Sequence, residues 1–260
     1  MKAKLPFELL IICLIFSFCT SGCNKDSSNP ASSSNFNGKG SDYFPVSSGK
    51  ILSATISGTA TVYDSLGNAI NFNQITNQTY SGSFGSSTTI RNMNANPIFY
   101  FVNNSSQLAG YLANSNGDLV GFDQHSSNPI VTIIPSDISV GKEWIINPQS
   151  SPSQQIKVKI IESLNTYKNS VGITYPNVIN LYITYKDSVG STYYYDQNNY
   201  YKWYTKDVSD GNIYFAKGIG FVGAKLNNYE EIKKAYQKYG SNIYNYYQRT
   251  KVTGIMGATN

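Results

Sequence analysis

Cysteine is missing from most of this chain, and histidine occurs only once. The three cysteines, Cys13, Cys19 and Cys23, all lie near the N-terminus of the 260-residue sequence. A secreted domain normally forms disulfides from an even number of spaced cysteines. Residues 24–260 therefore have no disulfide, no thiolate metal site and no cysteine nucleophile. His125 alone does not make a zinc site, so we expect no metal and no cofactor.

Charged side chains are also sparse. They make up 13% of the chain, and the formal net charge is +5. Lysine and arginine are spread thinly along the sequence and do not gather in one segment. Nucleic-acid-binding proteins usually show a clustered basic face. We therefore expect no nucleic-acid partner.

No hydrophobic run is long enough to span a membrane as a helix, and the longest run that is present predicts a signal peptide. Lys2 and Lys4 precede an apolar run over residues 9–18, and small residues follow it. The run is too short to span a bilayer as a permanent helix. A basic start, an apolar core of this length and a small-residue exit are typical of a secretory signal.

Cys23 follows Thr20, Ser21 and Gly22 directly. This arrangement resembles the lipobox of bacterial lipoproteins, although Thr20 stands where leucine is usual. The resemblance implies a signal peptide over 1–22, a lipid on Cys23 and membrane attachment through that lipid. A multiply acylated cysteine anchors a protein stably. Ordinary cleavage with an unmodified cysteine is the alternative. Asn24, in place of aspartate, favours the outer membrane, with either its periplasmic or its surface face open.

The segment after Cys23 predicts a tether. Residues 24–42 are mostly Ser, Asn, Gly and Lys, with Phe36 the exception before the segment ends. Such a composition buries too little apolar surface to offset the entropy of ordering. We therefore expect residues 23–42 to form a flexible link, dispensable for folding, and residues 43–260 to form the folded part.

Residues 43–260 show the periodicity of strands. Apolar and charged residues alternate over 156–160, as in a half-buried strand. Over 179–185, isoleucine and leucine share one face, and Asn180 and Tyr182 lie on the other. Further β-branched or aromatic runs lie at 56–62, 97–102, 107–113, 119–124, 130–134, 192–196, 201–205 and 213–216. Turn signals lie at 64–68, 116–117, 187–190 and 210–211.

This pattern predicts an all-β fold. Short antiparallel strands joined by tight turns favour a meander that forms a curved sheet, a half-barrel or a barrel. At most one short helix is expected, over residues 229–239, where glutamates precede lysines as the helix dipole favours. Residues 243–252 then return as a last strand. Similar proline-to-glycine stretches before 50 and at 135–142 leave open two related halves that meet near residue 135.

Three short motifs are spread widely along the chain. They are the stretch Asp42, Tyr43, Phe44 and Pro45 with Gly49, the stretch 141–144 ending in Trp144, and the glycine-rich stretch 214–222. This layout resembles uncharacterised Bacteroidota envelope lipoproteins, a family sometimes called TapB-like. Ile51 and Leu52 depart from the pattern, because an aromatic-rich strand is usual there. The resemblance implies a β-rich envelope domain with no assigned activity and no catalytic residues. We expect Trp144 in the core.

Two motifs that suggest chemistry have simpler explanations. Gly218, Gly220 and Gly223 match a dinucleotide fingerprint, but no convincing helix start follows, and no acidic residue occurs after Glu231. We interpret these glycines as a strand bend or bulge. His125 is expected in a surface loop, because neither a nucleophile elbow nor a triad pattern accompanies it.

Tyrosine is abundant, with 22 in the chain, and is concentrated in the C-terminal half. Residues 192–196 and 201–205 are expected to form neighbouring strands. Tyr193, Tyr195, Tyr201 and Trp203 then form one aromatic patch, which is either core or a binding surface. We treat these four as candidate binding residues.

The sequence therefore favours a non-enzymatic, lipid-anchored outer-membrane protein with a binding or scaffolding β domain. An apolar ligand inside a curved sheet is the first expectation, by fold-level analogy with lipoprotein carriers. A glycan- or protein-adhesion module is the alternative, and a hydrolase is the third. The expected partners are thus the membrane and a glycan, a lipid or an envelope protein.

Overall fold

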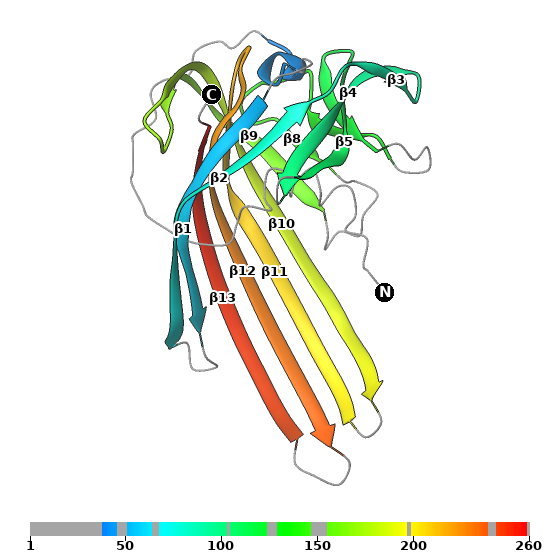
Figure 1. Cartoon of the computed structure of the whole chain (residues 1–260), viewed down its shortest axis with the longest axis vertical. Coiled ribbons are helices and arrows are strands. Elements are labelled where there is room, and N and C mark those ends of the chain that lie inside the picture. The colour runs from blue at the N-terminus through cyan, green and yellow to red at the C-terminus, as the bar shows by residue number, and fades with distance from the viewer. Residues whose placement is uncertain are drawn as a thin grey trace.

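The chain forms one antiparallel sheet with very long strands (Figure 1). The computed structural model describes residues 38–45, 51–63, 68–102, 105–123, 129–146, 155–196, 199–238 and 243–258. The elements are the 3-10 turn η1 (Gly40–Tyr43) and the strands β1 (Ile51–Tyr63), β2 (Ala69–Phe84), β3 (Thr88–Ile90), β4 (Met93–Val102), β5 (Ser105–Ser115), β6 (Asp118–Phe122), β7 (Val131–Ile134), β8 (Glu143–Ile145), β9 (Ile156–Lys168), β10 (Thr174–Asp196), β11 (Asn199–Ala216), β12 (Gly220–Lys238) and β13 (Ile243–Ala258).

The sheet is nearly closed and barrel-shaped, which confirms the predicted all-β fold class. Its strand order is β7-β6-β5-β4-β2-β1-β13-β12-β11-β10-β9-β8, and β3 pairs with β4 beside this path. Every pairing is antiparallel, and the first strand pairs with the last, with Ala54 opposite Ala258. The two edge strands, β7 and β8, follow each other in the chain, so the opening of the barrel lies between consecutive strands.

Alternation along each strand builds the main core. Ile156, Val158 and Ile160 are buried, while Lys157 and Lys159 between them are exposed. A fully buried aliphatic side chain stabilises the fold by roughly 1.5–3 kcal/mol. The core takes Leu119 and Ile134 from one side of residue 135 and many residues from the other, so both stretches share one sheet and one core.

The first described residues are bonded to turns at one end of the sheet. Ser41 N–H donates to the carbonyl of Gly117 at 3.0 Å, and Gly218 N–H donates to that of Asp42 at 2.7 Å. The turn η1 therefore links the β5–β6 turn to the β11–β12 turn, and its last residue, Tyr43, is fully buried. Packed contacts thus begin within the stretch expected to be a tether.

Two of the three spaced motifs meet at this place. The ring of Phe44 lies edge-on to those of Phe215, at 5.7 Å between centroids, and Phe84, at 5.9 Å. The Tyr-Phe-Pro opening therefore packs on the late aromatic and glycine-rich motif. Trp144 of the third motif contacts the same core but is only partly buried.

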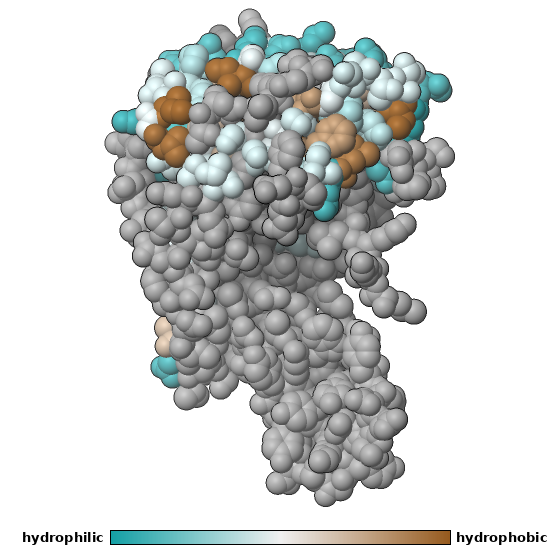
Figure 2. Space-filling model, viewed as in Figure 1, coloured by the Kyte–Doolittle hydropathy of each residue, from teal (hydrophilic) through white to brown (hydrophobic). Residues whose placement is uncertain are grey.

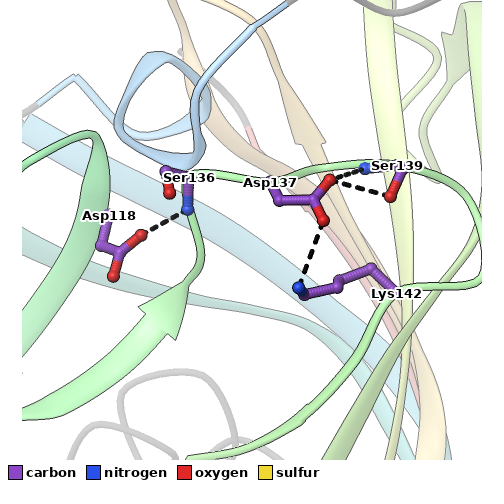
Figure 3. Close-up of polar contacts among 5 residues, drawn as sticks. All are labelled: Asp118, Ser136, Asp137, Ser139 and Lys142. Atoms are coloured by element: carbon purple, nitrogen blue, oxygen red, sulfur yellow. Dashed lines mark hydrogen bonds and ion pairs between the residues drawn. The ribbon is translucent and has the colours of Figure 1, made fainter.

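Residues 135–142 connect the two edge strands and are held by side chains of their own (Figure 3). Asp118 accepts a hydrogen bond from the main-chain N–H of Ser136. Asp137 accepts from both the N–H and the hydroxyl of Ser139 and forms an ion pair with Lys142 at 3.2 Å. The two hydrogen bonds from Ser139 lower the pKa of the Asp137 carboxyl below its ordinary value, and Lys142 lowers it further by a smaller amount.

The helix predicted over 229–239 is wrong. Residues up to Lys238 belong to β12, which pairs with β11 on one side and β13 on the other. Both neighbours satisfy its main-chain groups, and this pairing overrides the local helical preference. In the register of these pairings, Glu231 is opposite Lys206 in β11 and Arg249 in β13.

Two predicted turns also lie inside strands. Residues 187–190 belong to β10, and residues 210–211 belong to β11. Gly211 is needed there for close strand approach, because a Cβ on it would lie 2.2 Å from the carbonyl oxygen of Lys225. The predicted turn at 116–117 is confirmed. Lys217, Gly218 and Ile219 form the β11–β12 turn, and the register shifts next to it, as the bend-or-bulge interpretation requires.

Candidate functional site

The face of the sheet opposite the main core carries a polar and aromatic surface on β9, β10 and β11. Its residues are defined by register, because residues directly opposite each other in antiparallel strands share a face. Asn180 is opposite both Glu162 and Tyr214, and Tyr182 is opposite Asn212. Tyr167 joins these five residues, because its ring stacks on that of Tyr214. We call the set the polar–aromatic strip: Glu162, Tyr167, Asn180, Tyr182, Asn212 and Tyr214.

Asn180 is the centre of the strip. Its side-chain amide donates to Glu162 Oε1 at 2.6 Å, and the residue is only 2% exposed. Its Oδ1 atom, like Oδ1 of Asn212, is buried and has no hydrogen-bond partner within the described part of the chain. An unpaired buried acceptor costs about 1–3 kcal/mol, so two such atoms in one place suggest a functional role.

Two tyrosine rings stack beside these amides. The rings of Tyr167 and Tyr214 lie 4.0 Å apart at an angle of 14°. Burial, and then the Glu162 carboxylate, raise the pKa of Tyr214 to about 12. Burial also raises the pKa of Tyr167 and, with Asp210, that of Tyr182. All three phenols are therefore neutral hydroxyl groups at physiological pH.

An apolar cluster adjoins the strip under the β9–β10 turn. Val178, Ala216 and Val222 are fully buried there, and the ring of Tyr175 lies with them. The turn folds over this cluster, because the side chain of Asn169 donates to the carbonyls of Val222 and Ala258. The upper end of the strip is thereby fixed in position.

The strip combines hydrogen-bonding groups with stacked rings, and a second carboxylate lies beside it. Glu162 belongs to the strip on β9. Asp210 lies on β11, four residues before Tyr214, and its carboxylate accepts from the amide of Asn227 at 2.9 Å. Burial, and then the charge and a hydrogen bond of Asp210, raise the pKa of Tyr182, so Asp210 lies next to the strip.

The predicted aromatic patch fits the observed register poorly. Tyr201 is opposite Tyr194, and Trp203 is opposite Thr192, whereas Tyr193 is opposite Lys202. Tyr195 is likewise opposite Tyr200. The register shifts between Val189 and Thr192, so Tyr193 and Tyr195 are not directly opposite Tyr201 and Trp203. The side chains of the four lie outside the described part, so their role stays a prediction.

Two other candidates also lie outside the described residues, namely Cys23 and His125. In the described ranges, no three His, Cys, Asp or Glu side chains are grouped to hold a metal ion. The same ranges contain no helix long and apolar enough to cross a membrane.

The sequence contained a signal for the strip that the tyrosine-rich stretches obscured. Asparagine is uncommon in strand interiors. Asn180 and Asn212 nevertheless both lie within strands, on the face away from the isoleucines. No protein-family model matches the chain, and no curated protein sequence matches it either.

Proposed function

We propose that the protein is a non-enzymatic lipoprotein of the outer membrane whose β domain binds a glycan. Two kinds of observation support the proposal. The signal sequence and the Ser-Gly-Cys stretch before residue 24 favour a lipid anchor on Cys23. The polar–aromatic strip gives the folded part a surface with the chemistry of sugar recognition.

The single observation that carries the glycan is the pairing of stacked rings with planar amides and a carboxylate. Sugars present apolar C–H faces to aromatic rings and hydroxyl groups to hydrogen-bonding side chains. Tyr167, Tyr182 and Glu162 are partly exposed and so reachable by a ligand, while Asn180 orients Glu162 through its 2.6 Å bond. Aromatic residues with a polar end suit such partly wet interfaces.

The interior of the sheet favours this ligand over an apolar one. In the described part of the chain, buried aliphatic and aromatic side chains form the main core, among them Phe215, Ile179 and Leu226. Burial of these side chains stabilises the fold. An adhesion role on the opposite face therefore fits the described geometry better.

Binding of labelled oligosaccharides to the purified domain tests the ligand. Wild type should bind at least one neutral oligosaccharide, and Tyr182→Ala and Glu162→Gln should each weaken that binding by about tenfold, equivalent to 1.4 kcal/mol. Glu143→Gln is the matched control, since Glu143 pairs with Lys159 outside the strip. Absence of any glycan binding, or equal loss in the control, would contradict the assignment.

Incorporation of labelled palmitate tests the anchor. Cells expressing the full chain should label it, and Cys23→Ser should abolish the label and release the protein from the membrane fraction. Unchanged labelling in the variant would place the lipid elsewhere.

A further inference from the structure

One end of the sheet collects most of the described turns. Antiparallel strands reverse direction at each turn, so alternate turns lie at the same end. We call this place the loop end: it comprises η1 and residues 116–118, 135–142, 168–173 and 217–219 (upper part of Figure 1). The long strands β10–β13 extend away from it.

The loop end exposes large apolar side chains on loops that are held firmly. Val140 is 53% exposed, Val171 39% and Ile173 38%. Asn169 accepts hydrogen bonds from the main-chain N–H groups of Val171 and Ile173, which fixes the tip that carries them. Figure 2 shows hydrophobic residues scattered among hydrophilic ones at this end of the face drawn.

The charged residues at the loop end are compatible with an anionic lipid surface, because with the adjoining Lys39 lysines outnumber aspartates there. The loop end and Lys39 include four lysines among the described residues, of which Lys142 and Lys217 pair with Asp137 and Asp42 at 3.2 and 3.9 Å. The same segments contain three aspartates, Asp42, Asp118 and Asp137. Lys168 and Lys39 are exposed, and such side chains attract anionic lipid headgroups.

The chain also enters the domain at this end. Gly38 is the first described residue, and fourteen residues, 24–37, separate it from Cys23. A flexible segment of that length spans on the order of 20 Å, from 5–6 Å × √n. A lipid on Cys23 would therefore hold the loop end close to the bilayer, and closeness raises the effective concentration of weak contacts.

We infer that the loop end rests on the lipid surface, with Val140, Val171 and Ile173 among the headgroups. This inference rests on the proposed anchor at Cys23. A weakly amphipathic surface gains stable membrane contact when a covalent lipid supplies a second attachment. β10, with 23 residues, then directs its far end away from the membrane.

Site-specific labelling of the acylated protein tests this orientation. Acylation blocks Cys23 and the mature chain has no other cysteine, so Ile173→Cys adds a single thiol for an environment-sensitive dye. In vesicles of phosphatidylethanolamine and phosphatidylglycerol, the dye should shift to the blue and lose most of its fluorescence to spin-labelled lipid. Val140→Cys should behave in the same way.

Leu108→Cys is the matched control, because Leu108 is 41% exposed and lies toward the opposite end of β5. Its dye should be quenched little. Equal quenching at 173 and 108, or none at 140 and 173, would overturn the orientation. Mass spectrometry of the same sample separates the two proposals: an acylated chain with equal quenching contradicts the orientation alone, whereas an unmodified Cys23 contradicts the anchor and the orientation that depends on it.

Discussion

The side-chain amide of Asn169 donates a hydrogen bond of 2.8 Å to the main-chain carbonyl of Ala258. The two residues are 89 positions apart in the chain. The same amide also bonds Val222, at 3.1 Å, so one buried side chain joins the β9–β10 turn to the ends of β12 and β13. The turn is thereby part of the closed structure and does not project freely.

Replacing Asn169 with alanine should destabilise the fold. The variant loses four hydrogen bonds and removes one donor each from the buried carbonyls of Val222 and Ala258, which costs roughly 2–4 kcal/mol. Urea titration measures this change. Ser170→Ala in the same exposed turn is the control and should stay within about 0.5 kcal/mol of wild type. Equal midpoints for the two variants would show that the amide is not a stabilising link.

Gly40→Ala should lower the melting temperature. A Cβ at this position would lie 2.3 Å from the carbonyl oxygen of Pro135 and 2.4 Å from that of Ile134, and main chain cannot yield as a side chain can. Such overpacking costs about 1–3 kcal/mol. Gly38→Ala meets only side-chain atoms, at 3.2 Å or more, and should melt close to wild type. Identical melting of the two variants would mean that Gly40 is not packed closely against the main chain at the end of β7.

Trp144 combines core contact with an unpaired polar atom. Its ring packs against the main core, and its indole N–H is buried without a partner in the described part of the chain. Trp144→Ala should cost about 2–4 kcal/mol, because the ring is only partly buried. Trp144→Phe removes the unpaired donor and should cost under about 1 kcal/mol. Denaturant unfolding that ranks the two variants in the reverse order would contradict this description.

Ionisation of Tyr214 predicts a loss of stability in alkali. Burial raises its pKa from 10.0 to about 12, so above pH 10 the unfolded chain loses this proton while the folded chain keeps it. Stability is therefore complete below pH 10 and falls as the pH rises through 12, by about 2–3 kcal/mol for this group. Tyr214→Phe should flatten that fall, measured by urea unfolding at several pH values. An unchanged slope would mean that Tyr214 titrates normally.

Sequence periodicity predicted the fold class because burial on one face imposes alternation. Ile156, Val158 and Ile160 alternate with lysines, and the structure buries the three isoleucine and valine side chains as expected. Strand length was harder to predict. Asp-Gly at 210–211 is a local turn signal, yet both residues lie within β11. Gly211 is needed there because the neighbouring strand approaches it closely.

The binding surface was harder still to predict, because register depends on pairing between distant segments. Consecutive tyrosines near 193 and 201 suggested a patch, but a local irregularity changes which of them are opposite. The polar–aromatic strip forms only when Glu162, Asn180 and Tyr214 meet across three strands. Single-sequence patterns identify the polar face of each strand but not its neighbours.

The most direct test of the central claim is the mass of the N-terminal peptide of the protein purified from membranes. The account predicts a peptide that begins at Cys23 and carries acyl chains, because we propose that the signal peptide is removed just before that residue. Membrane attachment and the orientation of the loop end both depend on this modification. An unmodified peptide that begins at another residue would contradict the account.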